Sequence, residues 1–307
     1  NLFLEILLFM QIQYLYHVYG ALKKNQLILT NMNKKKFAVL GFPVEHSLSP
    51  IIHNSFAKQI NVDISYSKIK VDLKKFKEVV NQLRDEKFIG VNVTVPLKFE
   101  ALKVSASSSD NAKLSKAANC LSFKNNKIIH AENTDGFGLV KDLSNKKIDL
   151  MNLKILIIGA GGATSGVLPS LIKCKPKLIC VANRTIEKAE KLVYEFSEFD
   201  KYQNLQFDSL RLKKFSEFDL IINATSASLN NNVVEIPKKL LDSNPVLYDM
   251  MYGPKSNPFL SQARNEKKFD GIGMLVEQAA QSFNIWHGFY PNTMEVIKNL
   301  ESITNGT

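Results

Sequence analysis

The sequence contains little cysteine. Its three cysteines, Cys120, Cys174 and Cys180, are odd in number and lack the spacing of metal ligands. A disulfide framework needs an even set of cysteines in an oxidising compartment, and a zinc site needs ligands in close pairs. We therefore predict reduced, buried thiols in a cytoplasmic protein, without a bound metal.

Long hydrophobic runs are also rare. Residues 1–24 are apolar and aromatic, but Glu5 and His17 are among the polar residues that interrupt them, which makes a poor membrane span. The segment also lacks the basic start and the small-residue cleavage site of a secretory signal. We interpret residues 1–33 as an extension ahead of a true start at Met32, outside the fold. A membrane anchor or targeting helix is the alternative; we expect no membrane partner.

Acidic residues are too few to balance the basic ones, since 40 Lys+Arg against 29 Asp+Glu give a formal charge of +11. The lysines are scattered, however, and no arginine-rich block or aromatic-interleaved basic patch occurs. That pattern disfavours nucleic-acid binding and suits a small anionic substrate or a phosphorylated cofactor. The length of 307 residues is sufficient for two α/β domains that share a cleft.

The first part of the chain alternates between strand patterns and helix patterns. Predicted strands cover residues 36–44, 64–71 and 88–96, and a predicted hairpin covers 119–133, with its turn at Asn125 and Asn126. Predicted helices cover residues 50–60, 73–86, 97–104 and part of 106–118. Ser49 and Pro50 mark the start of the first helix, with Ser49 as its N-cap. Such alternation indicates a mostly parallel sheet covered by helices.

The alternation continues in a second unit. Predicted strands cover residues 153–158, 177–185, 218–226 and 244–252. Predicted helices begin at 136, after the glycines at 159–162, at 186 and at 259, the last running to 267. A long amphipathic segment, 274–291, follows the last strand and is expected to fold back on the first unit. We therefore predict an α/β protein with one domain over 34–134 and 271–304, and a Rossmann-like domain over 135–270.

A glycine-rich turn, GAGGAT, follows the first strand of the second unit. Its first glycine permits a tight turn, the next two let the backbone approach a pyrophosphate, and the helix that follows supplies N–H groups. The spacing departs from the GxGxxG pattern, so a plain strand–helix turn is the alternative. The expected cofactor contacts are Gly159, Ala160, Gly161, Gly162 and Ala163.

The tip of the next predicted strand indicates which dinucleotide binds. An NAD site usually offers an acid there to the ribose 2′-hydroxyl, whereas an NADP site offers arginine. Here the tip is Asn183, Arg184 and Thr185, with no acid. Arg184 can hold the 2′-phosphate as a planar fork, and Lys188 adds a second positive charge one helical turn later. We predict NADP; a solvated loop charge is the alternative for Arg184.

Small polar residues gather where predicted strands end or helices begin, which is where α/β proteins bind ligands. They are Ser47, Ser49, Asn92, Thr94, Lys98, Asn119, Asn133 and Asp135. Hydroxyls and amides recognise hydroxyls, and a lysine recognises a carboxylate or transfers a proton. The set suits a small polyhydroxylated acid, although each member alone could be a helix cap, a turn residue or an exposed strand residue.

These stretches belong to a longer ordered series. HSLSP, NVTVPLK, AAN, NTDG, GAGGA, NRT, INATS, YDMMYGP and GIGMLVEQAAQSF with Trp286 after it follow one another between about residues 36 and 300. Together they closely resemble the shikimate dehydrogenase family. Cys120, Gly253 and Glu277 depart from the threonine, asparagine and small residue that the family commonly has there.

The resemblance implies NADP-linked, reversible reduction of 3-dehydroshikimate to shikimate in aromatic amino acid biosynthesis. It places the catalytic pair on Lys98 and Asp135, where the carboxylate favours a charged lysine that acts chiefly as an acid in the reductive direction. It implies that the first domain binds the substrate, through Ser47, Ser49, Asn92, Thr94, Asn119, Tyr252 and Gln278. It adds Thr225, Met250 and Gly271 to the cofactor contacts.

Other functions stay open at this point. A quinate or dual quinate/shikimate dehydrogenase is the nearest, although Ser47, Ser49 and Arg184 favour shikimate with NADP. A non-catalytic NADP-binding or sensor protein would be expected to lack Lys98 or Asp135. A basic nucleic-acid binder predicts salt-sensitive DNA affinity. We expect a small-molecule substrate, no nucleic-acid partner, and a monomer or homodimer.

Overall fold

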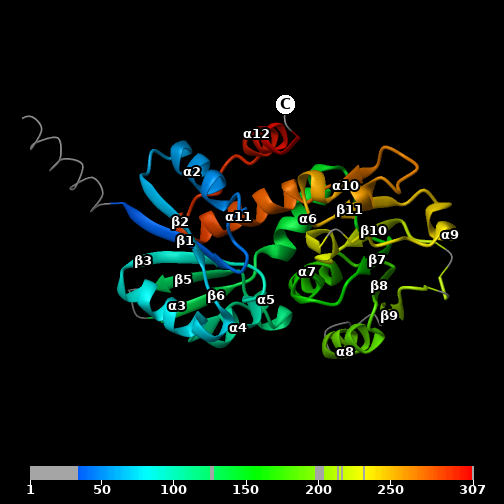
Figure 1. Ribbon diagram of the computed structural model, residues 1–307, viewed down its shortest axis with the longest axis horizontal. Helices are drawn as coiled ribbons and strands as arrows, with labels where there is room; N and C mark the ends of the chain where they lie inside the picture. The colour runs from blue at the N-terminus through cyan, green and yellow to red at the C-terminus, as the bar shows by residue number, and fades with distance from the viewer. Residues whose placement is uncertain are drawn as a thin grey trace, which may run out of the picture.

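The protein is described by a computed structural model that covers residues 34–124, 128–197, 204–212, 214–215, 217–230 and 232–305. The predicted N-terminal extension and the predicted hairpin turn at Asn125 and Asn126 lie outside these residues. Two sheets, each flanked by helices, stand side by side along the long axis of the molecule (Figure 1). Within the described residues, we find no helix with the length and apolar character needed to cross a membrane.

The first sheet has six strands in the order β2-β1-β3-β5-β6-β4. Their bounds are β1 Lys35–Gly41, β2 Ile64–Lys70, β3 Phe88–Val93, β4 Ser107–Ser108, β5 Cys120–Lys124 and β6 Ile128–Glu132. β1 pairs in parallel with β2 and β3, and β4 with β6, whereas β5 runs antiparallel to β3 and β6. The predicted hairpin is thus β5 and β6, inserted into an otherwise parallel sheet.

Helices cover both faces of this sheet because its central strands are apolar on both faces. In β1, Ala38 and Leu40 face one core, while Phe37 and Val39 face the other. The first core is closed by α3 Phe76–Asp85, α4 Lys98–Lys103 and α5 Asp110–Ser115. The second is closed by α2 Ser49–Gln59, α11 Ile272–His287 and α12 Met294–Asn305. A 3-10 turn, η1 Leu73–Lys75, precedes α3.

The second sheet is wholly parallel, in the order β12-β11-β10-β7-β8-β9. Its strands are β7 Lys154–Ile158, β8 Leu178–Asn183, β9 Leu205–Ser209, β10 Leu220–Asn223, β11 Val246–Asp249 and β12 Lys268–Phe269. Its helices are α6 Asp135–Asn145, α7 Gly162–Lys173, α8 Ile186–Phe196, η2 Ala227–Asn230, α9 Lys238–Leu241, η3 Gly253–Lys255 and α10 Asn257–Leu260. The strand order reverses between β7 and β10, which is the Rossmann switch point where dinucleotides bind.

Two helices join the sheets, α6 on the way out and α11 on the way back (Figure 1). They approach closely at two glycines: a Cβ on Gly138 would lie 2.7 Å from the Met274 carbonyl oxygen, and one on Gly273 would lie 1.8 Å from Asp142 Oδ1. Tyr248 donates a hydrogen bond of 2.7 Å to the other oxygen of Asp142. The predicted return of the C-terminal segment to the first sheet is confirmed.

Three local predictions are wrong. Ser49 is the first residue of α2 rather than its N-cap, which is Leu48, and Pro50 is therefore the second helical residue. The predicted helix over 259–267 is the single turn α10, followed by turns and bends from residue 261. The long terminal helix ends at His287, where Gly288 adopts φ +70° as a left-handed C-cap, and α12 is a separate helix.

Candidate active site

The ion pair between Lys98 and Asp135 joins the starts of two helices. Lys98 is the first residue of α4 and Asp135 the first of α6. Lys98 Nζ lies 2.5 Å from Asp135 Oδ2, and the two side chains are 18% and 6% exposed. β5 is antiparallel to both β3 and β6, so the carboxyl ends of β3 and β6 share one edge of the sheet. This topology brings together two residues that are distant in sequence.

The Asp135 carboxylate is held from several directions. Asp135 Oδ1 accepts a hydrogen bond of 2.9 Å from Asn119 Nδ2, and the backbone N–H of Asp135 donates to Asn133 Oδ1 at 3.0 Å. Its place in the first turn of α6 puts the negative charge at the positive end of the helix dipole. The Asp135 carboxylate therefore has a defined orientation toward Lys98.

Gly166 brings the second domain to the same point. It lies in α7, and a Cβ there would be 2.9 Å from Asp135 Oδ2 and 3.2 Å from Asn133 Nδ2. The sequence marks Gly166 as the fourth glycine after β7, but its contacts, Asn133 and Asp135, lie well before β7 in the chain and leave no local signal. The ion pair is thus at the junction of the two domains.

Asn119 Nδ2 faces more acceptors than it can serve. Besides Asp135 Oδ1, Thr134 Oγ1 lies at 2.9 Å and Gln278 Oε1 at 3.1 Å, while an amide nitrogen carries two hydrogens. Asn119 Oδ1 in turn accepts from the Thr134 backbone N–H at 2.8 Å. Thr134 Oγ1 can itself donate to Gln278 Oε1 at 3.3 Å, so these side chains form one connected network around Asp135.

The other residues predicted to bind the substrate divide by burial. Asn92 and Ser49 are each 5% exposed, and Ser49 Oγ accepts a hydrogen bond of 3.1 Å from Ser47 Oγ. Thr94 is half-buried where β3 ends, beside Gly41. Asn92 Nδ2 donates to the Asn119 carbonyl, and Asn119 Nδ2 lies within hydrogen-bond distance of Gln278 Oε1 and Asp135 Oδ1.

Tyr252 lies farther along, between η3 and the second sheet. Its ring is half-buried against the core that α2, α11 and α12 share with the first sheet. Burial raises the pKa of its phenol, so the hydroxyl keeps its proton at neutral pH.

The glycine turn after β7 provides an open backbone cradle. Gly159 adopts φ +113°, which favours glycine, and a Cβ there would lie 3.1 Å from Thr225 Cγ2. Gly161 is the N-cap of α7, and no atom lies within 4 Å of where its Cβ would be. Thr164 closes the turn by donating to the Gly159 carbonyl at 2.7 Å. The Phe99 ring of the first domain lies 3.7 Å from where a Cβ of Gly162 would be. Exposed N–H groups at a helix start fit a pyrophosphate.

The tip of β8 carries exposed positive charge. β8 ends at Asn183, whose Nδ2 donates to the Thr185 carbonyl at 2.8 Å, and Thr185 is the N-cap of α8. Arg184 and Lys188 are both exposed. The tip therefore offers two exposed cations to a 2′-phosphate, and β8 itself ends without a carboxylate.

The ends of β10 and β11 are joined by a buried amide–carboxylate contact. Asn223 Nδ2 donates to both Asp249 oxygens at 3.1 Å, and Asn223 Oδ1 accepts from Thr225 Oγ1 at 2.8 Å. The Met250 N–H donates to the Asn223 carbonyl at 2.9 Å, and a Cβ on Gly271 would lie 2.4 Å from the Met250 carbonyl oxygen. This contact orients Thr225, Met250 and Gly271, which were predicted as cofactor contacts.

Asn223 and Asp249 were not among the predicted site residues. The sequence feature that could have identified them is a polar residue at the end of each of two apolar strands, Asn223 in INATS and Asp249 in YDMMY. Burial raises the pKa of Asp249 to about 7, although hydrogen bonds from the Met251 N–H and Asn223 oppose the shift. The carboxyl group is thus close to half-protonated near neutral pH.

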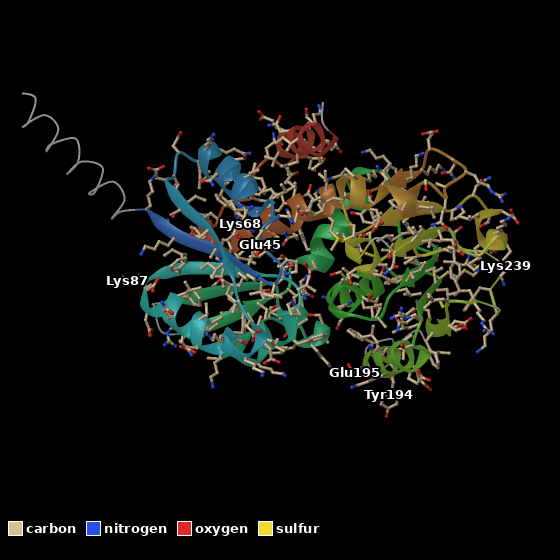
Figure 2. All side chains as sticks on the ribbon, viewed as in Figure 1. Glu45, Lys68, Lys87, Tyr194, Glu195 and Lys239 are labelled. Atoms are coloured by element: carbon tan, nitrogen blue, oxygen red, sulfur yellow. The ribbon has the colours of Figure 1, made fainter. Side chains whose placement is uncertain are left out.

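A cleft of about 650 Å³ separates the two domains beside the glycine turn. Its lining includes Phe99, Leu102, Lys103, Lys116, Ala160, Gly161, Lys188 and Leu192. Lys116 of the first domain lies 3.2 Å from Glu195, and Ser165 Oγ donates to the Ser115 carbonyl at 2.5 Å. Glu195 is labelled on α8 in Figure 2. In the described part of the chain, no group of three or more potential metal ligands occurs.

Comparison with known proteins covers both domains. Residues 39–121 match the shikimate dehydrogenase substrate binding domain, 142–249 the shikimate/quinate 5-dehydrogenase domain, and 271–299 the shikimate 5′-dehydrogenase C-terminal domain. A shikimate dehydrogenase (NADP(+)) of Legionella pneumophila is 42% identical over 275 residues, covering 87% of this chain and 99% of that one.

Solved structures agree in fold. A shikimate dehydrogenase in complex with NADP+ superposes with a TM-score of 0.80 at 33% identity, covering 87% of this chain and 94% of that one. A Thermus thermophilus shikimate 5-dehydrogenase with NADP(H) and shikimate gives 0.74 at 28% identity, covering 86% and 97%. Since these matches span the substrate-binding sheet, the Rossmann sheet and the returning helix, the chain belongs to the shikimate dehydrogenase family.

Proposed function

We propose that this protein reduces 3-dehydroshikimate to shikimate with NADPH, reversibly, in aromatic amino acid biosynthesis. The observation that carries the proposal is the part-buried Lys98–Asp135 ion pair at the domain junction, with the glycine turn on the facing domain. The named relatives and the complexes with NADP+ or shikimate support the same assignment.

The substrate end of the site uses side chains of the first domain. We assign substrate contacts to Ser47, Ser49, Thr94, Asn119, Tyr252 and Gln278, with Asn92 behind them. Hydroxyls and amides match the hydroxyl groups of a polyhydroxylated ring. The basic chain favours approach of the substrate carboxylate.

The cofactor end uses backbone and exposed cations of the second domain. The pyrophosphate lies on the turn from Gly159 to Ala163, and Asn183, Arg184, Thr185 and Lys188 hold the adenosine 2′-phosphate. Thr225, Met250 and Gly271 surround the nicotinamide end. When bound, NADPH supplies the hydride that the ketone carbon accepts.

Lys98 completes the reduction as the acid. The ketone oxygen gains negative charge as the carbon is reduced, and the Lys98 ammonium donates a proton to that oxygen. Asp135 orients the lysine through the 2.5 Å contact, and Asn119 keeps the carboxylate in place. In the oxidative direction the same lysine accepts the proton of the substrate hydroxyl.

We also propose how the chain divides into domains, where in the cell the protein acts and what its oligomeric state is. The substrate domain comprises residues 34–134 and 271–304, and the NADP domain comprises 135–270, with the change at the first residue of α6. The enzyme acts in the cytoplasm as a monomer or homodimer.

The deciding experiment follows NADPH absorbance on addition of 3-dehydroshikimate, with NADH as the matched cofactor. Parallel oxidation assays use shikimate and quinate with each oxidised cofactor. We expect turnover with shikimate and NADP. Faster turnover with quinate would indicate a quinate or dual enzyme, and tight NADPH binding without turnover would indicate a sensor.

A further inference from the structure

His53 is a buried side chain to which the proposed reaction assigns no role. It lies in α2 with no exposed surface, and its ring stacks on Tyr66 at 4.5 Å between centroids. Trp286 and Phe283 pack around it, at 5.3 and 6.2 Å. Burial lowers the pKa of His53 to about 3, and nearby His287 contributes to the shift, so the ring is neutral at ordinary pH.

The only hydrogen-bond partner of His53 in the described structure is Asn92. His53 Nε2 lies 3.1 Å from Asn92 Oδ1, whereas Nδ1 has no partner among the described residues. A neutral imidazole carries one N–H, and an amide oxygen only accepts. The hydrogen must therefore be on Nε2, which makes His53 a donor to Asn92.

Asn92 is thereby bonded at every position. Its Oδ1 accepts from both His53 Nε2 and Tyr66 Oη, the latter at 2.7 Å. Its Nδ2 donates to the Asn119 carbonyl at 3.2 Å and to Ser282 Oγ at 3.0 Å. Two donors on the oxygen define which end of the amide is which, so both hydrogens of Nδ2 point toward Asn119 and Ser282. No group of Asn92 remains for a substrate.

The two groups that Asn92 holds lead directly to the catalytic carboxylate. Ser282 Oγ lies 3.3 Å from Thr134 Oγ1, and the Asn119 side chain contacts both Thr134 and Asp135. Hydrogen bonds thus run from the interior of α2 through β3 and β5 to the first residue of α6. All the members are buried, so water cannot replace a lost bond without cost.

We propose that His53 is a positioning residue: as a neutral Nε2–H donor it orients the Asn92 amide, which in turn holds Asn119 and Ser282 in the geometry that Asp135 requires. Asn92 accordingly acts on catalysis through these neighbours rather than by touching the substrate. The inference deepens the proposed function and rests on it for its kinetic consequence.

The test compares two variants of His53 with a control in the same aromatic cluster. His53→Phe keeps a planar ring but deletes the donor, whereas His53→Gln keeps an N–H donor. The control is His287→Phe, because His287 stacks on Phe283 at 4.1 Å and has no hydrogen bond to Asn92. Each variant is assayed for kcat and for KM with 3-dehydroshikimate and with NADPH, and its Tm is measured.

We expect His53→Phe to lower kcat/KM for 3-dehydroshikimate by about tenfold or more, since a buried acceptor loses one of its donors. KM for NADPH should stay unchanged, and His53→Gln should recover most of the loss. His287→Phe should leave kcat/KM at the wild-type level whatever it does to Tm. Equal losses in His53→Phe and His287→Phe, or no recovery in His53→Gln, would overturn the proposal.

A second readout needs no substrate. The side-chain amide hydrogens of Asn92, observed by NMR with isotope labelling, should exchange slowly in the wild type and at least tenfold faster in His53→Phe. If the wild type fails to reduce 3-dehydroshikimate but this difference appears, the reaction is wrong and the positioning role stands. If the wild type is active and exchange is unaffected, the positioning role is wrong and the reaction stands.

Discussion

The two halves of the proposed site, for substrate and for cofactor, are built in opposite ways. On the substrate side, Asn92, Asn119 and Asp135 are each at most 5% exposed and are connected by hydrogen bonds. On the cofactor side, the Gly161 turn has empty space above it, and Arg184 is exposed. A small substrate must be oriented against one reacting carbon, so its site is rigid before binding. A long dinucleotide gains its affinity from many separate contacts, which can be exposed.

The largest effect should come from the substrate side. Lys98→Ala removes the proton donor, and we expect kcat to fall by about 10²–10⁴-fold with little change in KM for 3-dehydroshikimate. Steady-state kinetics checks this, with exposed Lys77→Ala on α3 as the control. A raised KM with kcat preserved would make Lys98 a binding residue and remove the contrast between the two sides.

On the cofactor side the effect should be smaller and selective. Arg184→Ala deletes a charge-assisted contact to the 2′-phosphate, worth about 1.5–3 kcal/mol, or roughly 10–150-fold in KM for NADP. KM for NAD should change little, because NAD lacks that phosphate. Kinetics with both cofactors tests this, with half-buried Arg84→Ala in the first domain as the control. Equal changes for NAD and NADP would argue against the contact.

Two glycine variants should separate packing from cofactor binding. Gly273→Ala places a methyl 1.8 Å from Asp142 Oδ1, between α6 and α11, and overpacking of this kind costs about 1–3 kcal/mol in the free energy of unfolding. Gly161→Ala meets no atom within 4 Å and has φ −107°, so stability should be unchanged while KM for NADP rises. Urea denaturation and kinetics measure both. A stable Gly273→Ala would mean that the two linking helices can separate easily.

The smallest predicted effect concerns pH. Burial lowers the pKa of His53 from 6.5 to about 3, so the unfolded chain binds a proton below pH 6.5 that the folded chain refuses. The stability contributed by neutral His53 is therefore full above pH 6.5 and is lost as pH falls toward 3. Between pH 6 and pH 5, the loss in the free energy of unfolding from this residue amounts to about 1 kcal/mol.

His53→Gln should remove this part of the slope. Burial lowers the pKa of His287 to about 4, so this residue also makes stability depend on pH in the same range. Its part of the slope should remain in the His53→Gln variant. Urea denaturation at pH 6 and pH 5 compares the two proteins. Identical slopes in wild type and variant would show that His53 is protonated in the folded protein.

The regular elements were predictable where apolar periodicity was strong. The strand at 153–158 became β7 and the helix after the glycines became α7, because buried parallel strands and amphipathic helices have distinct periods. β9, with the short pattern LQFDS, was not predicted, and neither was α12 as a separate helix. The helix predicted over 259–267 was wrong because a four-residue helix, Asn257–Leu260, already buries Phe259 and Leu260.

The candidate site was predictable in its residue types and less so in its connections. Asn92 lies on a strand face that looks half-polar in sequence, yet it is buried because His53, Tyr66 and Ser282 supply partners from three other elements. Each of these partners has an ordinary local context, so no sequence period reveals the contact.

The sequence by itself determined the α/β alternation, the open glycine turn, the cationic tip of β8 and the resemblance that pointed to Lys98 and Asp135. These depend on local periodicity, on backbone freedom at glycine and on short-range order along the chain. Only the tertiary structure decided that Asp135 meets Gly166 and Lys98, that Asn223 joins Asp249, and that His53 orients Asn92. Those contacts exist because strand pairing and burial bring distant polar groups together where water cannot satisfy them.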